Sequence, residues 1–431
     1  MTHRLVLLLV LVGLVAAGCG GSSSSQTSAA SCTESGPTCV RVGLGQPLYL
    51  GTLLFESDPI GVDVARSIRL AIDYLDGTFD GIPGQLLGHD VSVVAEDDGC
   101  SAVGGRTGAI RLLQEPALVA VIGTSCSSAA FGAADVTLEK DNVLLLSASN
   151  TAPGLTDSST HERNYFRIAF NDIIQGSTVA DFAFTRQQWA TAISVHKEDD
   201  AYSTQLTEAF TQSFLLLGGT SLSDLGVSES LPPAAVQRAV AKAQPAFVFI
   251  AEFTPVCDEI AAAIRQAPST RDIPIVVSEA CQTPTFLKTL GADANGIYTS
   301  GPDFSTVRES EFYNTEYLPA YRRLTGGDPI GVFHPTAWDT ANLLFDAIRR
   351  TAVSDSSGVL TIDREALRRA LLEVRGYEGL SGRLSCTSSG DCAEGARIAI
   401  YRAPNWPVNK GDAAEPIFSQ LKTLSQIKNG G

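Results

Sequence analysis

The chain has 431 residues and a mass of 45.4 kDa, which exceeds one ordinary domain and suits two or three. Hydrophobic residues make up 44% of the sequence and charged residues 18%, a globular composition that excludes a wholly disordered protein. The formal net charge of −16 would repel a phosphate backbone, so we expect no nucleic-acid partner.

The N-terminal segment predicts export to the outer face of a bacterial membrane. Residues 1–18 contain one arginine, an apolar run too short to span a bilayer, and small residues, which is typical of a secretory signal peptide. The sequence AAGC at 16–19 resembles the lipobox of bacterial lipoproteins, which implies cleavage before Cys19 and a diacylglycerol on its sulfur. Plain secretion with an unmodified Cys19 is the alternative. Residues 19–39 then form a flexible, lipid-anchored tether, and no later stretch is apolar enough to cross a membrane.

The chain beyond the tether alternates strands and helices. Between residues 61 and 75, apolar side chains recur at helical spacing. Strands are predicted at 40–44, 91–95, 117–122 and 143–146, and further helices at 107–114 and 130–138. This alternation of strands and helices indicates a parallel sheet that is covered by helices on both faces.

A second alternating series begins after residues 165–168. Its predicted helices are at 173–185, 206–217, 257–266, 286–290, 310–324, 335–352 and 364–372, and its strands at 191–195, 246–251, 275–277 and 397–401. The fold class is therefore predicted as α/β, with two doubly wound parallel-sheet lobes of similar size. Open sheets of this kind bind ligands in the crevice at the carboxyl ends of their strands.

Four cysteines follow predicted strands, in a compartment that permits disulfides. They are Cys100, Cys126, Cys257 and Cys281. If the strands before Cys100 and Cys126 are neighbours in the sheet, the two sulfurs lie together at its carboxyl edge. The same argument applies to Cys257 and Cys281.

The remaining four cysteines of the exported chain lie in two close pairs. Each pair is near enough in sequence for a disulfide to close a small loop: Cys32 with Cys39, and Cys386 with Cys392. Buried free thiols are the alternative for some of the eight. A metal site is disfavoured because the sequence has no CxxC pair and its five histidines are scattered.

Polar residues follow the predicted strands where a ligand would bind. Residues 123–128 and 147–152 each leave a strand with hydroxyl side chains, and the first segment precedes a helix whose N–H groups suit a carboxylate. A simple helix cap is the alternative for this segment. In the second lobe, Tyr202, Phe253 and Glu279 come at or just beyond strand ends. The Glu279 carboxylate would pair with an ammonium group there, or else face solvent.

Catalytic patterns are missing from the sequence. It contains no P-loop, no GxSxG nucleophile elbow, no HExxH helix and no GxGxxG that opens a strand–helix unit. We therefore expect a binding protein rather than an enzyme, with no cofactor and no metal.

Several motifs occur in a distinctive order along the chain. They are GVDVARSIRLAI at 61–72, EDDGC at 96–100, GTSCSS at 123–128, SASNTAPGLT at 147–156, FRIAFND at 166–172 followed by Gln175-Gly176, and GLSGRL at 379–384. In this order they resemble the periplasmic binding proteins for branched-chain amino acids (Leu/Ile/Val), which have the type I solute-binding fold, over residues 40–403. The resemblance implies two hinged lobes joined by three crossings of the chain. The first would comprise 40–168 and 301–393, the second 169–300 and 394–420, and the tail 421–431.

The resemblance also implies a ligand site. In that family, serine and threonine of the first lobe hold the α-carboxylate and α-amino groups of an amino acid, and an acid of the second lobe takes the ammonium group. The corresponding positions are Ser127, Ser149 and Thr151 in the first lobe, Glu279 as the acid, Tyr202 and Phe253 as lining aromatics, and Ile60 at a place often aromatic in relatives.

The resulting prediction is a lipid-anchored solute-binding protein of an ABC transporter. It would capture an amino acid or a similar small polar solute between its lobes and deliver it to a membrane permease, acting as a monomer. A sensory module that signals lobe closure to a membrane partner is the alternative, and an enzyme on the same scaffold has the least support.

Overall fold

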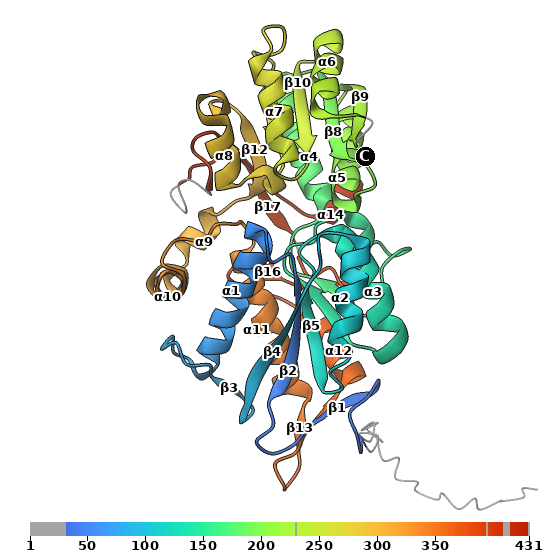
Figure 1. Cartoon of the computed structure of the whole chain (residues 1–431), viewed down its shortest axis with the longest axis vertical. Helices are drawn as coiled ribbons and strands as arrows, with labels where there is room; N and C mark the ends of the chain where they lie inside the picture. The colour runs from blue at the N-terminus through green and yellow to red at the C-terminus, as the bar shows by residue number, and fades with distance from the viewer. Residues whose placement is uncertain (1–31, 229–230, 394, 408–413, 430–431) are drawn as a thin grey trace, which may run out of the picture. The chain divides into compact units, whose positions relative to one another are not determined.

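The strands in the part of the chain that the structure describes divide between two larger sheets and two small ones (Figure 1). The structure, a computed structural model, describes residues 32–228, 231–393, 395–407 and 414–429. The predicted signal peptide and the predicted lipidation site, Cys19, lie outside these ranges. Within them, no helix has both the length and the apolar character that a membrane span requires.

The first large sheet has six strands in the order β3-β4-β2-β5-β6-β7. All neighbours are parallel except β3, which is antiparallel to β4. Its strands are β2 (Leu48–Leu54), β3 (Gln85–Leu86), β4 (His89–Asp97), β5 (Leu118–Gly123), β6 (Leu144–Ser147) and β7 (Tyr165–Arg167). The carboxyl ends of β2, β4, β5 and β6 therefore meet at one edge of this sheet, and the hydroxyl-rich segments at 123–128 and 147–152 leave from that edge.

Helices cover both faces of the first sheet, because alternate strand residues point to opposite sides. In β6, Leu144 and Leu146 belong to the hydrophobic cluster with α1 and α11, whereas Leu145 belongs to the cluster with α2 and α3. The helices of this part are α1 (Pro59–Asp73), α2 (Ala102–Leu112), α3 (Ser127–Asp141), α9 (Ser305–Glu309), α10 (Leu318–Thr325), α11 (His334–Thr351) and α12 (Arg364–Leu372).

The second large sheet has seven strands in the order β18-β17-β12-β11-β10-β8-β9. The run from β12 to β9 is parallel, and β17 and β18 add antiparallel strands at one edge. Its strands are β8 (Thr191–Lys197), β9 (Thr220–Val227), β10 (Phe247–Ala251), β11 (Ile275–Val277), β12 (Tyr298–Pro302), β17 (Ala396–Arg402) and β18 (Phe418–Lys422). The parallel α/β fold class predicted from the sequence is thus confirmed for both sheets.

The second sheet is also covered on both faces. In β10, Phe247 and Phe249 pack in the cluster with α4 and α5, and Val248 and Ile250 pack in the cluster with α6, α7 and α8. The helices are α4 (Asp172–Asp181), α5 (Ala201–Leu216), α6 (Pro233–Ala243), α7 (Val256–Gln266), α8 (Pro284–Leu290) and α14 (Leu424–Asn429).

The chain passes between the two sheets three times: after β7, after β12 and before β17. The lobe boundary predicted between residues 300 and 301 falls inside β12, two residues before that strand ends. β18 and α14 occupy most of the segment predicted as a tail. The remaining lobe boundaries stay a prediction.

The strand predicted at 40–44 does not belong to either large sheet. Residues Cys39–Val42 form β1, which pairs with β14 (Leu360–Asp363) and, through it, with β13 (Val353–Ser354). The central strand β2 was not predicted, because its sequence LYLGTLL is interrupted by Gly51. Gly51 lies in a tightly packed place, since a Cβ there would be 3.0 Å from a Val121 methyl and 3.2 Å from a Leu112 methyl.

The structure contains the four disulfides Cys32–Cys39, Cys100–Cys126, Cys257–Cys281 and Cys386–Cys392. The strands before Cys257 and Cys281, β10 and β11, are neighbours as predicted. The strands before Cys100 and Cys126 are not neighbours, because β2 lies between β4 and β5. The sulfurs of Cys100 and Cys126 meet beyond the end of β2 instead. The Cys386–Cys392 loop follows the hairpin of β15 (Tyr377–Gly379) and β16 (Gly382–Leu384).

Candidate ligand-binding site

The two hydroxyl-rich loops of the first sheet meet at its carboxyl edge. Ser127 begins α3 after β5, and Thr151 lies in the loop after β6. The Ser127 Oγ accepts hydrogen bonds from the backbone N–H groups of Thr151 and Ala152, each at 3.3 Å. The structure therefore brings Ser127 and Thr151 together, and both side chains are buried.

Ser149, in the loop after β6, is hydrogen-bonded to the segment that precedes Ser127. Its hydroxyl donates to the carbonyl oxygen of Ser125 at 2.9 Å, and the neighbouring Asn150 Nδ2 donates to the Thr124 carbonyl oxygen at 2.9 Å. The single proton of the Ser149 hydroxyl is therefore already engaged by the backbone. Ser149 joins the two loops to each other, and its contact with a ligand stays a prediction.

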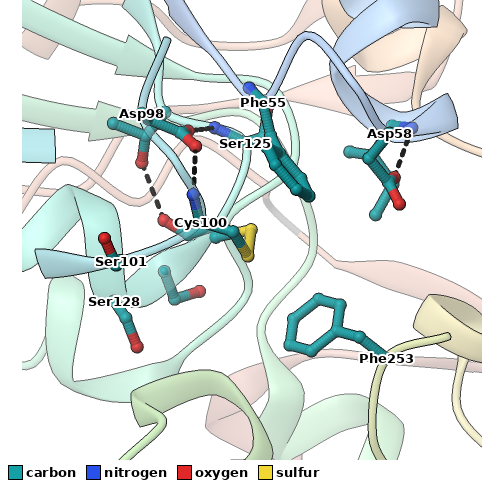
Figure 2. Close-up of a disulfide and its surroundings, with 12 residues drawn as sticks. Phe55, Asp58, Asp98, Cys100, Ser101, Ser125, Ser128 and Phe253 are labelled. Carbon is teal, nitrogen blue, oxygen red and sulfur yellow. Dashed lines mark hydrogen bonds between the residues drawn. A yellow bond between two sulfur atoms is a disulfide. The ribbon is translucent and has the colours of Figure 1, made fainter. Parts of the chain in front are cut away.

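The start of α3 is held in place by a buried carboxylate. Asp98 accepts hydrogen bonds from the backbone N–H groups of Cys100 at 2.8 Å and Ser125 at 2.6 Å, beside the Cys100–Cys126 disulfide (Figure 2). Burial raises the pKa of Asp98 to about 6, against the lowering effect of these hydrogen bonds. Cys126 supplies no side-chain cap to α3, so the first-turn N–H groups of this helix point out beside Ser127.

On the second sheet, Tyr202 and Glu279 are in direct contact. The Tyr202 hydroxyl donates to Glu279 Oε1 at 2.7 Å, and Gln175 Nε2 donates to Glu279 Oε2. The Tyr202 and Phe253 ring centroids are 5.2 Å apart. Glu279 is only 5% exposed, and burial raises the pKa of its carboxyl group. The three second-lobe residues predicted from the sequence therefore lie together.

Asp172 is a further acid of the site that the sequence analysis did not single out. It is the first residue of α4, and its backbone N–H donates to the Thr151 carbonyl oxygen at 3.0 Å. The side chain is 0% exposed, and both carboxylate oxygens lack a hydrogen-bond partner. Burial raises the pKa of Asp172 well above its ordinary value, the negative charge of Glu279 raises it further, and the neighbouring Thr151 hydroxyl lowers it in part.

Asp172 and Glu279 form a pair of buried acids beside the hydroxyls of Ser127 and Thr151. Within the described ranges, neither carboxylate is hydrogen-bonded or ion-paired to a lysine or arginine. A buried, unpaired carboxylate is unfavourable unless a cation or a proton neutralises it. The arrangement therefore suits a ligand whose positive group lies next to a group that accepts hydrogen bonds from hydroxyls and backbone amides.

Aromatic side chains from both sheets approach the same region. Figure 2 shows Phe55, which follows β2, and Phe253, which follows β10, directed toward the space beside the Cys100–Cys126 disulfide. Lys197 Nζ lies 5.9 Å from the centroid of the Phe253 ring. Ile60 is half-buried in the first turn of α1 and packs against the hydrophobic cluster of that helix. Its contact with a ligand stays a prediction, and Phe55 is the aromatic residue that the sequence analysis missed.

The two sheets are also hydrogen-bonded to each other around this site. The backbone N–H of Ala201 donates to Ser128 Oγ at 2.9 Å, and the backbone N–H of Gly154 donates to Gln205 Oε1 at 2.7 Å. Ser128 lies in the first turn of α3 and Gly154 in the turn after β6, whereas Ala201 and Gln205 belong to α5. Among the described residues, no group of three or more His, Cys, Asp and Glu side chains is arranged to hold a metal ion.

Solved structures with the same fold include transport proteins. The chain is similar to the leucine-binding protein LivK from Thermotoga maritima, with a TM-score of 0.72 and 19% identity over 86% of this chain and 98% of that one. It is also similar to the branched-chain amino acid transporter substrate-binding protein LivJ from Streptococcus pneumoniae in complex with isoleucine (TM-score 0.68, 17% identity, 88% and 99% covered). A third is an ABC transporter solute-binding protein from R. palustris in complex with benzoate (TM-score 0.69, 17% identity, 86% and 96% covered).

Identities this low show a shared fold alone. A search of curated protein sequences finds no match to this chain. The family model described as periplasmic binding protein matches residues 55–399, which include both large sheets except β2, β18 and the last three residues of β17. This match covers most of the sequence and all the site residues described above. The chain therefore belongs to the periplasmic binding protein family.

Proposed function

We propose that this protein is the solute-binding component of an ABC transporter and that its ligand is an α-amino acid. The observation that carries the proposal is the position of Asp172, whose unpartnered carboxylate lies beside Thr151 and near Glu279. An α-amino acid places its ammonium and carboxylate groups one carbon apart. Its ammonium group would donate hydrogen bonds to both acids and balance one negative charge, while its carboxylate would accept hydrogen bonds at Ser127 and Thr151.

An aromatic acid, such as the benzoate bound by the R. palustris protein, fits this site less well. Its carboxylate would have donors at Ser127 and Thr151. It carries no positive group for Asp172 and Glu279, which would stay buried without a partner cation. The acid pair therefore favours an amino acid over a simple carboxylic acid.

Export, lipid anchoring at Cys19 and delivery to a permease complete the proposed function. Family membership and the signal-like sequence before Cys19 support these steps. Mass spectrometry of the N-terminal peptide from the cell-made protein tests the anchor. A diacylglyceryl group on Cys19 is expected, and an unmodified Cys19 would leave secretion without a lipid.

Isothermal titration of the purified protein with the common L-amino acids tests the ligand class, after a thermal-shift screen has selected candidates. Replacing Thr151→Ala should weaken binding by roughly 1–3 kcal/mol, because the ligand carboxylate loses one hydroxyl donor. Thr107→Ala is a matched control, since the Thr107 hydroxyl donates only to the Val103 carbonyl oxygen within α2. Failure of every amino acid to bind, or unchanged affinity in Thr151→Ala, would contradict the proposal.

A further inference from the structure

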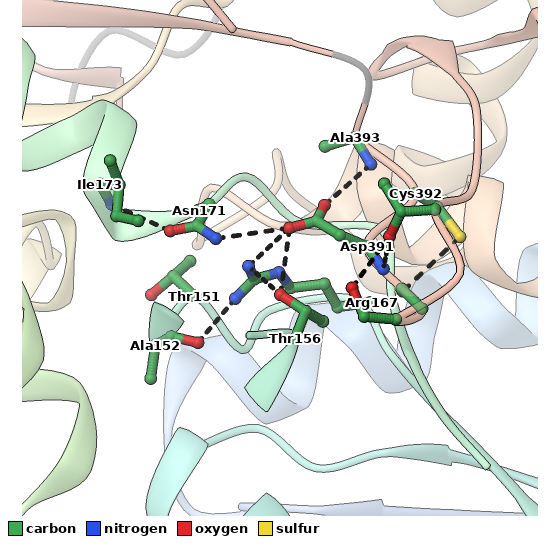
Figure 3. A network of polar contacts seen from close by, with 12 residues as sticks. Thr151, Ala152, Thr156, Arg167, Asn171, Ile173, Asp391, Cys392 and Ala393 are labelled. Carbon is green, nitrogen blue, oxygen red and sulfur yellow. Dashed lines mark hydrogen bonds and ion pairs between the residues drawn. The ribbon is translucent and has the colours of Figure 1, made fainter. Parts of the chain in front are cut away.

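A buried arginine connects the ligand loop of the first sheet to the crossings between the sheets. Arg167, the last residue of β7, is 0% exposed. Its Nη1 donates to the Ala152 carbonyl oxygen at 2.8 Å, and its Nη2 donates to Thr156 Oγ1 at 2.6 Å and Asp391 Oδ2 at 2.7 Å (Figure 3). One side chain thus fixes both ends of the turn that follows Thr151.

Asp391, the partner of Arg167, lies in the loop closed by the Cys386–Cys392 disulfide, next to the third crossing. Backbone hydrogen bonds hold this loop against β7: Arg167 N–H donates to the Gly390 carbonyl oxygen, and Cys392 N–H donates to the Arg167 carbonyl oxygen, both at 2.9 Å. Asp391 Oδ2 also accepts from Thr156 Oγ1 at 3.1 Å. The carboxylate is therefore fixed by backbone as well as by side-chain contacts.

The same carboxylate reaches the first crossing. Asn171 Nδ2 donates to Asp391 Oδ2 at 3.4 Å, and Asn171 Oδ1 accepts from the Ile173 N–H at 3.0 Å, which caps α4 (Figure 3). Asp172, the unpartnered acid of the ligand site, is the next residue. The network therefore joins the loop that carries Thr151 to the helix start that carries Asp172.

Stability alone does not explain such a network. Taking a guanidinium and a carboxylate out of water costs free energy that their attraction only partly returns, so a buried ion pair is weak evidence for a gain in stability. A buried guanidinium group that is hydrogen-bonded to three segments does, however, restrict the positions of those segments relative to one another. Arg167 has this geometry, because its donors are shared among the ligand loop, Thr156 and Asp391.

We propose that the Arg167–Asp391 ion pair is a positioning device that holds the loop at 151–156 against the start of α4, so that Thr151 and Asp172 face one ligand. Both residues act through others and do not themselves touch the ligand. The identity of the ligand as an amino acid rests on the proposed function, whereas the claim that the ion pair positions the loop is independent of it. Its test can therefore be made on the protein without any ligand.

The chain offers a matched control in Arg364. This arginine is also buried and donates to backbone carbonyl oxygens, at 2.8 Å to Leu118, 3.0 Å to Val119 and 3.1 Å to Gly36. Leu118 and Val119 lie at the amino end of β5, whereas the ligand loops leave from the carboxyl ends of the strands. Arg364→Lys should lower stability without changing the ligand loop.

Hydrogen–deuterium exchange of the ligand-free protein measures the positioning directly. The informative amides are those of Thr151 and Ala152, which donate to Ser127 Oγ, and that of Asp172, which donates to the Thr151 carbonyl oxygen. In Arg167→Lys these amides should exchange about tenfold faster, because lysine cannot donate to Ala152 and Asp391 in the same fork geometry. Arg364→Lys should leave their exchange unchanged.

The double variant Arg167→Met/Asp391→Leu separates positioning from stability. It leaves neither charge buried alone, so its unfolding temperature should be close to that of the wild type. The three amides should still exchange fast, because the Ala152 carbonyl oxygen has lost its donor. Wild-type exchange in the double variant, or in Arg167→Lys, would overturn the positioning role. Absence of amino-acid binding by the wild type would refute the proposed ligand instead, and would leave the exchange result to decide the role of Arg167.

Discussion

The Ser128 hydroxyl donates a hydrogen bond to Asp200 Oδ2 across 2.8 Å, and this bond joins the first turn of α3 to the start of α5. Asp200 Oδ1 at the same time caps α5 by accepting from the Ser203 N–H at 2.9 Å. The two helices begin after β5 and β8, strands of different sheets. The two halves of the candidate site are thus bonded directly to each other through α3 and α5.

Loss of the Ser128 hydroxyl should speed the release of the ligand. Ser128→Ala removes two hydrogen bonds between the sheets, those to Asp200 and from Ala201, and favours their separation by about 1 kcal/mol. We expect the dissociation rate, measured by stopped-flow fluorescence, to rise several-fold. Ser223→Ala is the control, because its hydroxyl donates only to the Leu222 carbonyl oxygen in β9. Equal dissociation rates in Ser128→Ala and the wild type would contradict this role of the bond.

Neutralising Glu279 should weaken the binding of a ligand that carries an ammonium group. Glu279→Gln keeps the size of the side chain and an acceptor for the Tyr202 hydroxyl but removes the negative charge. The expected loss is about 1.5–3 kcal/mol of binding free energy, the usual value for a hydrogen bond to a charged group. Titration calorimetry measures it, with the exposed Glu198→Gln as control. Undiminished affinity in Glu279→Gln would place the ammonium group elsewhere.

Asp172→Asn should affect binding and stability in opposite directions. The Asp172 carboxyl group is buried and its pKa is raised well above the ordinary value, so an uncharged amide at this position avoids the free-energy cost of burying a charge or of protonating the carboxylate in the ligand-free protein. We expect a higher unfolding temperature together with weaker amino-acid binding. Calorimetric unfolding and ligand titration measure the two effects on one sample. A variant with lower stability and unchanged affinity would exclude Asp172 from the ligand site.

The stability of the protein should depend on pH through Asp98. Its pKa is about 6 in the folded protein and near 3.8 in an ordinary aspartate, so the folded chain binds this proton more tightly than the unfolded chain. The free energy of unfolding therefore falls as pH rises from about 4 to about 6, and the contribution of Asp98 is constant above that window.

Denaturant unfolding at several pH values checks this dependence. Asp98→Asn should flatten the decline by up to about 1.4 kcal/mol per pH unit, the value for one proton. Asp90→Asn, which changes an exposed carboxylate near the other end of β4, should leave the slope as it is in the wild type. An identical slope in Asp98→Asn would show that the Asp98 proton is not held in the folded protein.

The sequence predicted the parts of the fold that depend on local pattern. Apolar spacing identified α1, and the alternation of strands and helices identified two parallel sheets. The order of strands in a sheet is not local, and for this reason the insertion of β2 between β4 and β5 was not foreseen. The Cys100–Cys126 pair was predicted on the assumption of neighbouring strands, which was wrong, although the disulfide is present.

The same distinction applies to the site. The loops with Ser127 and Thr151 were predictable, because they follow apolar strands and are rich in hydroxyl groups. Asp172 follows the helix-capping residue Asn171, so it looked like an ordinary acid in the first turn of a helix. Its importance depends on burial against Glu279 from the second sheet. The Arg167–Asp391 pair joins residues 224 positions apart, which no local pattern reveals.

A titration of the protein with one bound amino acid and two of its analogues tests most directly whether a single ligand joins the two sheets. The first analogue lacks the amino group, and the second has its carboxylate converted to an uncharged amide. The parent amino acid should bind, and each analogue should bind more weakly. The first analogue has no cationic donor for Asp172 and Glu279, and the second offers Ser127 and Thr151 an uncharged acceptor in place of a carboxylate. Full affinity for either analogue would show that the ligand is held by one sheet alone.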